Sequence, residues 1–407
     1  TCIIWNPHTG EKTTTLTGHT STVTGVAWNP DGTRLATVSW DGTGIVWDSR
    51  TGHPITTLAG HTFWVTEAAW NPDGTHLATT NDDRTCIIWN PHTGKPITTL
   101  TGHTSWVTEA AWNPDGTHLA TTSWDRTCII WNPHTGKPIT TLTGHARGVT
   151  GVAWNPDGDL IATTSDDRTC IIWKPETREK ILTLTGHTDA VNGVAWNPDG
   201  THLATTSNDR TCIIWNPHTG KPITTLTGHA RGVTGVAWNP DGDLIATTSN
   251  DRTCIIWNPH TAEKITTLTG HTSAVTGIAW HPSGDLIATT SDDHTCIIWH
   301  PDTGEKITTL TDHTRTVTGI AWHPTGDLIA TTDASGLIRI SHLDGTLQRA
   351  FISVRPRIPG VESYASWTPA GLDVLEGEAW RVLRIPEPGG GSRRLELPGL
   401  SYEPPTD

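Results

Sequence analysis

A histidine that follows glycine or aspartate recurs at intervals of 42 residues along most of this chain. Each of these histidines opens a near copy of one stretch, of which residues 186–227 are an example. A fixed period of this length indicates a solenoid, a propeller or another array of small units, none of which can bury its apolar surface alone. The eight histidines are His19, His61, His103, His145, His187, His229, His271 and His313.

Within residues 186–227, apolar residues alternate with small or polar ones over short runs, as half-buried strands require. These runs predict four strands, at 191–196, 202–207, 211–215 and 223–227. An Asn-Pro-Asp-Gly turn follows the first strand and a second Pro/Gly turn precedes the fourth, which makes the unit an antiparallel sheet. Stacking the units radially protects the sheet edges, whereas an open solenoid leaves its end faces bare. We therefore expect an all-β fold of the propeller type.

Gly-His opens each regular unit, aspartate lies in the second bend, tryptophan ends the third strand, and Trp47-Asp48 closes the third strand of the first unit as a Trp-Asp dipeptide. In these residues the repeat resembles the WD-repeat β-propeller family, which is named after that dipeptide. The resemblance extends over residues 1–340 and implies four-stranded blades of 42 residues. We expect one closed ring of eight or nine blades. The alternative is a seven-bladed ring over about 102–398, with the earlier units belonging to a truncated neighbouring ring.

The units divide the chain into five segments. A half blade comes first, with only a third and a fourth strand for possible ring closure, and a degenerate eighth repeat and a divergent terminal repeat follow the regular array. With no methionine in the chain, Thr1 is not a natural start, and we expect a longer protein with domains upstream. The segments are 1–17 (half blade), 18–311 (seven regular repeats), 312–351 (degenerate repeat), 352–398 (divergent repeat) and 399–407 (disordered tail).

Composition narrows the function classes. The formal net charge is −14, and the absence of a basic stripe argues against a nucleic-acid partner. No apolar run reaches membrane-spanning length. The seven cysteines occupy the same third-strand position, one in each of seven units, too far apart for disulfides and without the pairing of a metal site, so we expect neither a metal nor a cofactor. Unpaired thiols favour a reducing compartment, and the cytoplasm is the default expectation.

A histidine, a serine, an aspartate and a tryptophan recur together in six of the seven regular units, and by residue type they suggest a nucleophile, a base and an acid. Because an enzyme needs one active site rather than one in each blade, we interpret the set as structural. The family resemblance implies the same, since the matching residues there form a hydrogen-bonded network. The six sets are His19, Ser39, Asp41 and Trp47; His103, Ser123, Asp125 and Trp131; His145, Ser165, Asp167 and Trp173; His187, Ser207, Asp209 and Trp215; His229, Ser249, Asp251 and Trp257; His271, Ser291, Asp293 and Trp299.

The copies differ from one another at three places: just after Gly-His, just before the bend aspartate, and in the first strand. Strand alternation puts the first two places at one end of the sheets, so we expect one diversified face. The resemblance implies that this face binds a protein or peptide, and aromatic residues beside carboxylates favour a partner with basic side chains. Harmless drift among duplicated copies is the alternative. The candidate residues are Trp40, Phe63, Trp64, Glu67, Asp82, Trp106, Glu109, Trp124, Arg147, Asp189, Arg231 and Arg315.

The leading hypothesis is thus a non-catalytic interaction scaffold, part of a larger multidomain signalling or regulatory protein. A propeller that binds or hydrolyses a ligand or glycan in its central funnel is the second hypothesis. Glu67 and Glu109 are its candidate carboxylate pair, because glycoside hydrolysis uses two acidic side chains at a defined separation.

Overall fold

A computed structural model describes residues 2–334 in full and, further along the chain, the backbone of six strands between 338 and 394. The chain divides into two compact units, Thr1–Gly336 and Leu337–Asp407. All the regular structure described in both units is β-strand.

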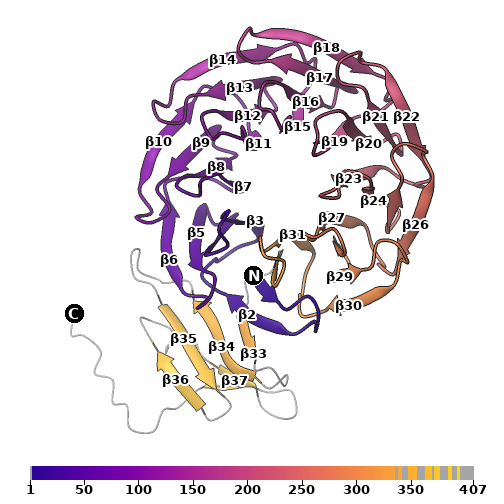
Figure 1. Cartoon of the computed structure of the whole chain (residues 1–407). Helices are drawn as coiled ribbons and strands as arrows, with labels where there is room; N and C mark the ends of the chain where they lie inside the picture. Colours follow the sequence, from indigo (N-terminus) through magenta and orange to yellow (C-terminus); the bar gives the residue numbers. More distant parts are fainter. Residues whose placement is uncertain are drawn as a thin grey trace. The chain divides into compact units, whose positions relative to one another are not determined.

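The first unit is a ring of eight four-stranded antiparallel sheets, or blades (Figure 1). In blade 5 the strands follow chain order, β19 (Val191–Trp196), β20 (Leu203–Ser207), β21 (Thr211–Trp215) and β22 (Pro222–Thr227). The first strand of each blade lies towards the centre of the ring and the fourth lies at its rim. The predicted strands of the repeat and its propeller fold are therefore confirmed.

Seven blades follow the order of the chain without interruption. Besides blade 5, they are blade 1, β3 (Val23–Trp28), β4 (Arg34–Ser39), β5 (Thr43–Asp48) and β6 (Pro54–Ala59); blade 2, β7 (Val65–Trp70), β8 (Leu77–Asn81), β9 (Thr85–Trp89) and β10 (Pro96–Thr101); blade 3, β11 (Val107–Trp112), β12 (Leu119–Ser123), β13 (Thr127–Trp131) and β14 (Pro138–Thr143); blade 4, β15 (Val149–Trp154), β16 (Ile161–Ser165), β17 (Thr169–Lys174) and β18 (Glu179–Thr185); blade 6, β23 (Val233–Trp238), β24 (Ile245–Ser249), β25 (Thr253–Trp257) and β26 (Lys264–Thr269); and blade 7, β27 (Val275–Trp280), β28 (Ile287–Ser291), β29 (Cys296–Trp299) and β30 (Lys306–Leu310).

Blade 8 is made from both ends of this unit. Its inner strands are β31 (Val317–Trp322) and β32 (Ile329–Asp333), and its outer strands are β1 (Cys2–Trp5) and β2 (Lys12–Leu16). β1 pairs with β32 in antiparallel register, with Ile4 opposite Ala330. The half blade at the start of the chain thus closes a single ring of eight blades. A ninth blade and the seven-bladed alternative are wrong, because the third- and fourth-strand places of blade 8 are filled by β1 and β2.

The hydrophobic core lies between blades rather than within them. Cys170 and Ile172 of blade 4, for example, pack with Leu203, Ile213 and Trp215 of blade 5, and all five are buried. Equivalent clusters lie at other blade boundaries, including the one between blades 8 and 1. A blade removed from the ring would expose both of its apolar faces, which is why the repeats fold only as an array.

The second unit contains an antiparallel sheet in the order β33 (Ile338–Ser341), β34 (Leu347–Val354), β35 (Ser363–Thr368) and β36 (Gly371–Leu375). A two-stranded sheet, β37 (Arg384–Pro386) with β38 (Ser392–Arg394), follows. Within the divergent repeat at 352–398, residues 379–383 resemble a third strand in sequence, but they lie outside the described residues, as does the expected disordered tail at 399–407. So does Ser335, which has the place of the bend aspartate in the degenerate repeat.

Candidate functional site

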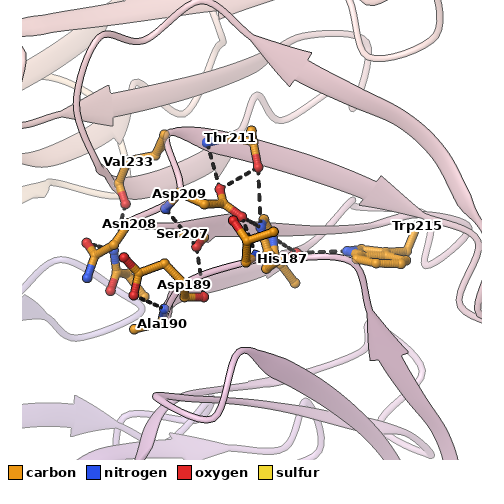
Figure 2. A network of polar contacts seen from close by, with 12 residues as sticks. His187, Asp189, Ala190, Ser207, Asn208, Asp209, Thr211, Trp215 and Val233 are labelled. Carbon is orange, nitrogen blue, oxygen red and sulfur yellow. Dashed lines mark hydrogen bonds and ion pairs between the residues drawn. The ribbon is translucent and has the colours of Figure 1, made fainter.

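A chain of hydrogen bonds crosses each blade from its third strand to the loop that enters it, and Figure 2 shows the chain in blade 5. Trp215 donates its indole N–H to Thr205 Oγ1 at 2.8 Å. Thr205 Oγ1 lies 2.9 Å from His187 Nε2, and His187 Nδ1 lies 2.8 Å from Asp209 Oδ2. With the proton on Nδ1, the imidazole donates to Asp209 and accepts from the Thr205 hydroxyl, which in turn accepts from the indole.

Asp209 is the best-connected member of this chain. Its Oδ1 accepts from the backbone N–H and the hydroxyl of Thr211, at 3.0 and 2.6 Å, and its Oδ2 also accepts from Thr188 N at 2.9 Å. Burial alone would raise the pKa of Asp209, but these hydrogen bonds and the one from His187 outweigh it and lower the pKa. The carboxylate therefore ties the bend to the loop between blades 4 and 5.

The hydroxyl in this chain belongs to threonine, whereas the sequence analysis assigned it to the serine two residues later. Ser207 instead accepts from the N–H of Asp209 at 3.0 Å and donates to the carbonyl of Asp189 at 3.0 Å. Thr205 and Ser207 are two residues apart on one strand, so their side chains point to the same face of the sheet. Only the Thr205 hydroxyl accepts the indole N–H of Trp215. In blade 2, where the serine is replaced, the Asn81 amide makes the same two contacts, to Phe63 O and from Asp83 N.

The same contacts recur around the ring, and in blade 8 residues from both ends of the unit supply them. Trp5 donates to Thr331 Oγ1 at 2.7 Å, and His313 contacts Thr331 and Asp333 at 2.6 and 2.8 Å. The carboxylate thus comes from the position that serine has in other repeats. The bridging threonines are Thr37, Thr79, Thr121, Thr163, Thr205, Thr247, Thr289 and Thr331.

Hydroxyl, imidazole and carboxylate follow the order of a hydrolase triad, but no substrate can reach the hydroxyl. Thr205 is 0% exposed, and its oxygen already accepts the indole proton. A nucleophile must present a lone pair to a reacting carbon beside an oxyanion site. Gly186, before the histidine, is also packed tightly, since a Cβ there would lie 3.0 Å from the Trp215 ring. The geometry suits a structural clamp that locks each blade to its incoming loop.

The two variable loops of each blade meet at one end of the ring, here called the bend face. In blade 1 Trp40 N donates to Thr22 O, and in blade 3 Trp124 N donates to Trp106 O, at 2.9 and 3.1 Å. Equivalent bonds join the two loops in the other blades, for example Asp82 N to Trp64 O. The residues before the bend aspartate and after Gly-His therefore share this face.

Five of the candidate residues form what we call the aromatic patch, over blades 1 to 3 of the bend face. Trp40 of blade 1 stacks on Trp64 of blade 2, with ring centroids 4.9 Å apart and planes inclined by 22°. Trp106 and Trp124 of blade 3 lie 5.8 Å apart. With Phe63, these rings keep 42% to 62% of their surface exposed. The patch consists of Trp40, Phe63, Trp64, Trp106 and Trp124.

The other candidates are spread more widely. Arg147, Asp189, Arg231 and Arg315 are exposed at the loops that enter blades 4, 5, 6 and 8. Asp82 is half-buried beside the patch, and burial, with a smaller effect of the Asp83 charge, raises its pKa. The structure thus divides the predicted face into an aromatic arc and a more polar arc.

Glu67 and Glu109 occupy the third position of the inner strands β7 and β11 and are partly buried. Glu67 Oε2 accepts from Ala110 N at 2.8 Å, and Glu109 Oε2 accepts from Val152 N at 2.7 Å, so each reaches the next blade. Burial and then the Glu109 charge raise the pKa of Glu67 well above its usual range. Burial raises that of Glu109 to about 7. We call them the carboxylate pair.

A second set of tryptophans lies at the other end of the ring, one at the end of the first strand of each blade. These residues were not among the candidates predicted from the sequence. Each indole donates to an alanine carbonyl of the preceding blade; Trp196, for example, bonds Ala153 O at 3.1 Å, and Trp28 bonds Ala321 O across the closure. Four of them, in blades 2 to 5, line a hollow of about 550 Å³. Their 42-residue spacing is the signal that could have revealed them. The set is Trp28, Trp70, Trp112, Trp154, Trp196, Trp238, Trp280 and Trp322.

All seven cysteines are buried and unpaired. Burial raises the pKa of the Cys2 thiol to about 12 and shifts the other thiols in the same direction. Within residues 2–334, no three His, Cys, Asp or Glu side chains gather as a metal site. Nor does the described part of the chain contain a helix that could span a membrane.

Comparison with known families agrees with this architecture. Residues 10–48, 52–90 and 94–132 each match the model of the WD domain, G-beta repeat. Residues 149–323 match the model of the second β-propeller of the echinoderm microtubule-associated protein. No curated protein sequence matches the chain. Propellers of these two families usually mediate protein–protein interactions and generally carry no catalytic site. The matched repeats, the ring of eight blades and the clamp in each blade together show that this chain belongs to the WD-repeat β-propeller family.

Proposed function

We propose that this propeller is a non-catalytic recognition module that binds a protein or peptide through the aromatic patch. The observation that carries the proposal is the gathering of five exposed aromatic rings on three neighbouring blades, while the same loops of the other blades carry small or polar residues. Exposed aromatic clusters of this kind are typical of interface hot spots.

The size of the patch suits a modest but specific interface. Each ring has about 200 Å² of surface, so five rings that are about half exposed offer about 500 Å². Burying about 100 Å² of one ring contributes about 2.5 kcal/mol before the entropic cost of binding is subtracted. Stacking of Trp40 on Trp64 holds both rings in place, which lowers that cost.

Selection of peptides from a random displayed library on the immobilised propeller tests this proposal. The patch variant replaces each aromatic residue by one that other blades have at the same position, so that the fold is kept. Selected peptides should lose at least about a hundredfold in affinity on the patch variant, as expected when several hot-spot residues are removed. The five changes are Trp40→Asn, Phe63→Ser, Trp64→Ala, Trp106→Ala and Trp124→Asn.

A matched control changes the polar arc of the same face, through Arg147→Ser, Arg231→Ser and Arg315→Ser. Peptides that bind the patch should keep their affinity for this control. Equal binding to the parent protein and the patch variant, or loss on the control alone, would place the interface elsewhere and refute the proposal.

The scaffold role and the compartment are further parts of the proposal. A ring with one specialised arc leaves most of its rim free for other domains of a longer signalling or regulatory protein. The seven buried thiols support the cytoplasm, since a reducing compartment keeps such groups unpaired. Recovery of the protein outside the cytoplasmic fraction of host cells would contradict that location.

A further inference from the structure

The carboxylate pair differs from the rest of the ring at a position where the fold favours glycine. Six blades have glycine there, and a Cβ on it would lie 2.6–3.0 Å from the facing side chain of the second strand. Contacts this short force the neighbouring side chain to move. Glutamate in blades 2 and 3 is therefore accommodated only by local adjustment, which is not expected of harmless drift. The glycines are Gly25, Gly151, Gly193, Gly235, Gly277 and Gly319.

The pair also lacks a cation. Each glutamate uses Oε2 to accept one backbone N–H of the next blade, and Oε1 has no hydrogen bond within residues 2–334. No lysine, arginine or histidine of the same residues forms an ion pair with Glu67 or Glu109. Two neighbouring acidic groups that are partly desolvated and unpaired repel each other, and a positive charge between them would remove that cost.

The carboxylate pair lies on two strands that begin directly after two residues of the aromatic patch, Trp64 and Trp106. Glu67 follows Trp64 by three residues and Glu109 follows Trp106 by three, so each carboxylate begins about 10 Å along the inner strand from an exposed indole. Both side chains are partly exposed. Indole rings attract cations over their faces, so the patch offers a favourable first contact for the same charge.

We propose that the aromatic patch and the carboxylate pair form one site, in which the partner inserts a lysine or arginine side chain between the indoles and the two glutamates. This inference rests on the proposed function, because it names the chemistry that the patch recognises. The peptide's apolar residues cover the rings, and its cation supplies the charge that the propeller lacks at this position.

Binding of the cation is coupled to proton release. Burial raises the pKa of Glu109 to about 7, and burial together with the Glu109 charge raises that of Glu67 well above its usual range, so the empty pair takes up a proton as the pH falls through about 7. A cation favours the ionised form and displaces this proton. Affinity should therefore rise as the pH is raised through about 7, and fall as it is lowered.

The test uses peptides selected on the parent propeller and two sets of controls. On the peptide side, lysine is replaced by norleucine or arginine by citrulline, which keep the shape and remove the charge. On the protein side, the double variant Glu67→Gly and Glu109→Gly reproduces the residue of the six other blades and leaves the aromatic patch intact. Affinity is measured by calorimetry at pH 6 and pH 8, in buffers of different ionisation enthalpy, which reports released protons.

We expect each neutral peptide, and each pairing with the glycine variant, to bind at least about tenfold more weakly than the parent pair at pH 8, as for loss of a partly buried charge pair. The parent pair should also release protons on binding, and the glycine variant should not. Retained affinity for the glycine variant, together with loss on the patch variant, would overturn this inference while leaving the proposed function intact. Failure to select any peptide would overturn both. A fall in the glycine variant's thermal stability without a change in affinity would assign the glutamates to blade packing alone.

Discussion

Ile4→Ala tests whether the first strand of the chain closes the ring. Ile4 is 0% exposed and packs with Leu16, Trp28, Leu35 and other side chains at the boundary of blades 8 and 1. If β1 belongs to blade 8, truncating Ile4 removes buried contacts from the core. If residues 1–17 lay outside the ring, the same change would cost almost nothing.

The expected loss follows from the atoms removed. Ile→Ala deletes three buried carbon groups, or about 2.4 kcal/mol of transfer free energy at about 0.8 kcal/mol each. The cavity that remains raises this to about 3 kcal/mol, within the range of about 2–5 kcal/mol for such changes in cores. Ile214 has the same place in blade 5, is also 0% exposed, and packs with Leu226, Ile245 and Trp257. Ile214→Ala is therefore a matched control with the same expected loss.

Both variants are compared by equilibrium unfolding in guanidinium chloride, with far-ultraviolet circular dichroism as the signal. The midpoints should shift by similar amounts at an unchanged slope, because both changes destabilise one cooperative ring. The reasoning is refuted if Ile214→Ala loses about 3 kcal/mol while Ile4→Ala stays within about 0.5 kcal/mol of the parent protein.

Four further predictions concern the clamp and the core. Thr121→Val removes the hydroxyl that an indole and an imidazole share, and it should lower the free energy of unfolding by about 2–4 kcal/mol. Ser123→Ala should lower it by only about 1 kcal/mol in the same unfolding experiment. Equal losses would contradict the central place of the threonine. Stability should fall as the pH drops below 6.5, because burial lowers the pKa of His229 and His271 below that value in the folded state and protonation then favours unfolding. A second loss should follow between about pH 4 and 2, where Asp41, with its pKa lowered from 3.8 to about 2, takes up a proton; a flat stability profile from pH 7 to pH 2 would contradict both. The seven buried thiols should not react with a thiol reagent at pH 8 until denaturant is added, and rapid labelling of the native protein would show that the core opens.

The fold could be predicted closely because every unit repeats the same strand and turn residues. The blade count could not, because it depends on which strands fill the outer places of the last blade. Residues after Asp333 lose the repeat pattern gradually, so both eight and nine blades were compatible with the sequence. The structure settles the blade count, because β1 pairs with β32. These strands lie more than 300 residues apart in the chain, and a local sequence pattern does not encode a contact over that separation.

For the clamp, residue types predict some of the members but not the bridging hydroxyl. Histidine, aspartate and tryptophan were identified correctly as members, but threonine and serine alternate on one face of the second strand and sequence spacing does not show which is level with the indole. Comparison of all eight repeats contains the answer. The threonine is present in every blade, whereas the serine is replaced by Asn81 in blade 2 and by Asp333 in blade 8.

The aromatic patch is a departure from an otherwise regular repeat. Every blade has the same clamp and the same kind of core, so folding alone sets no requirement that blades 1 to 3 should differ from the others. The differences there are unusual for a soluble ring, since they expose large aromatic surfaces and place glutamates where the other six blades have glycine packed against a side chain of the second strand. Neither feature is needed to close a blade or to complete a clamp, since the other blades do without them. The asymmetry of an otherwise uniform ring is therefore the argument for the proposed binding function, and the patch and glycine variants are its direct test.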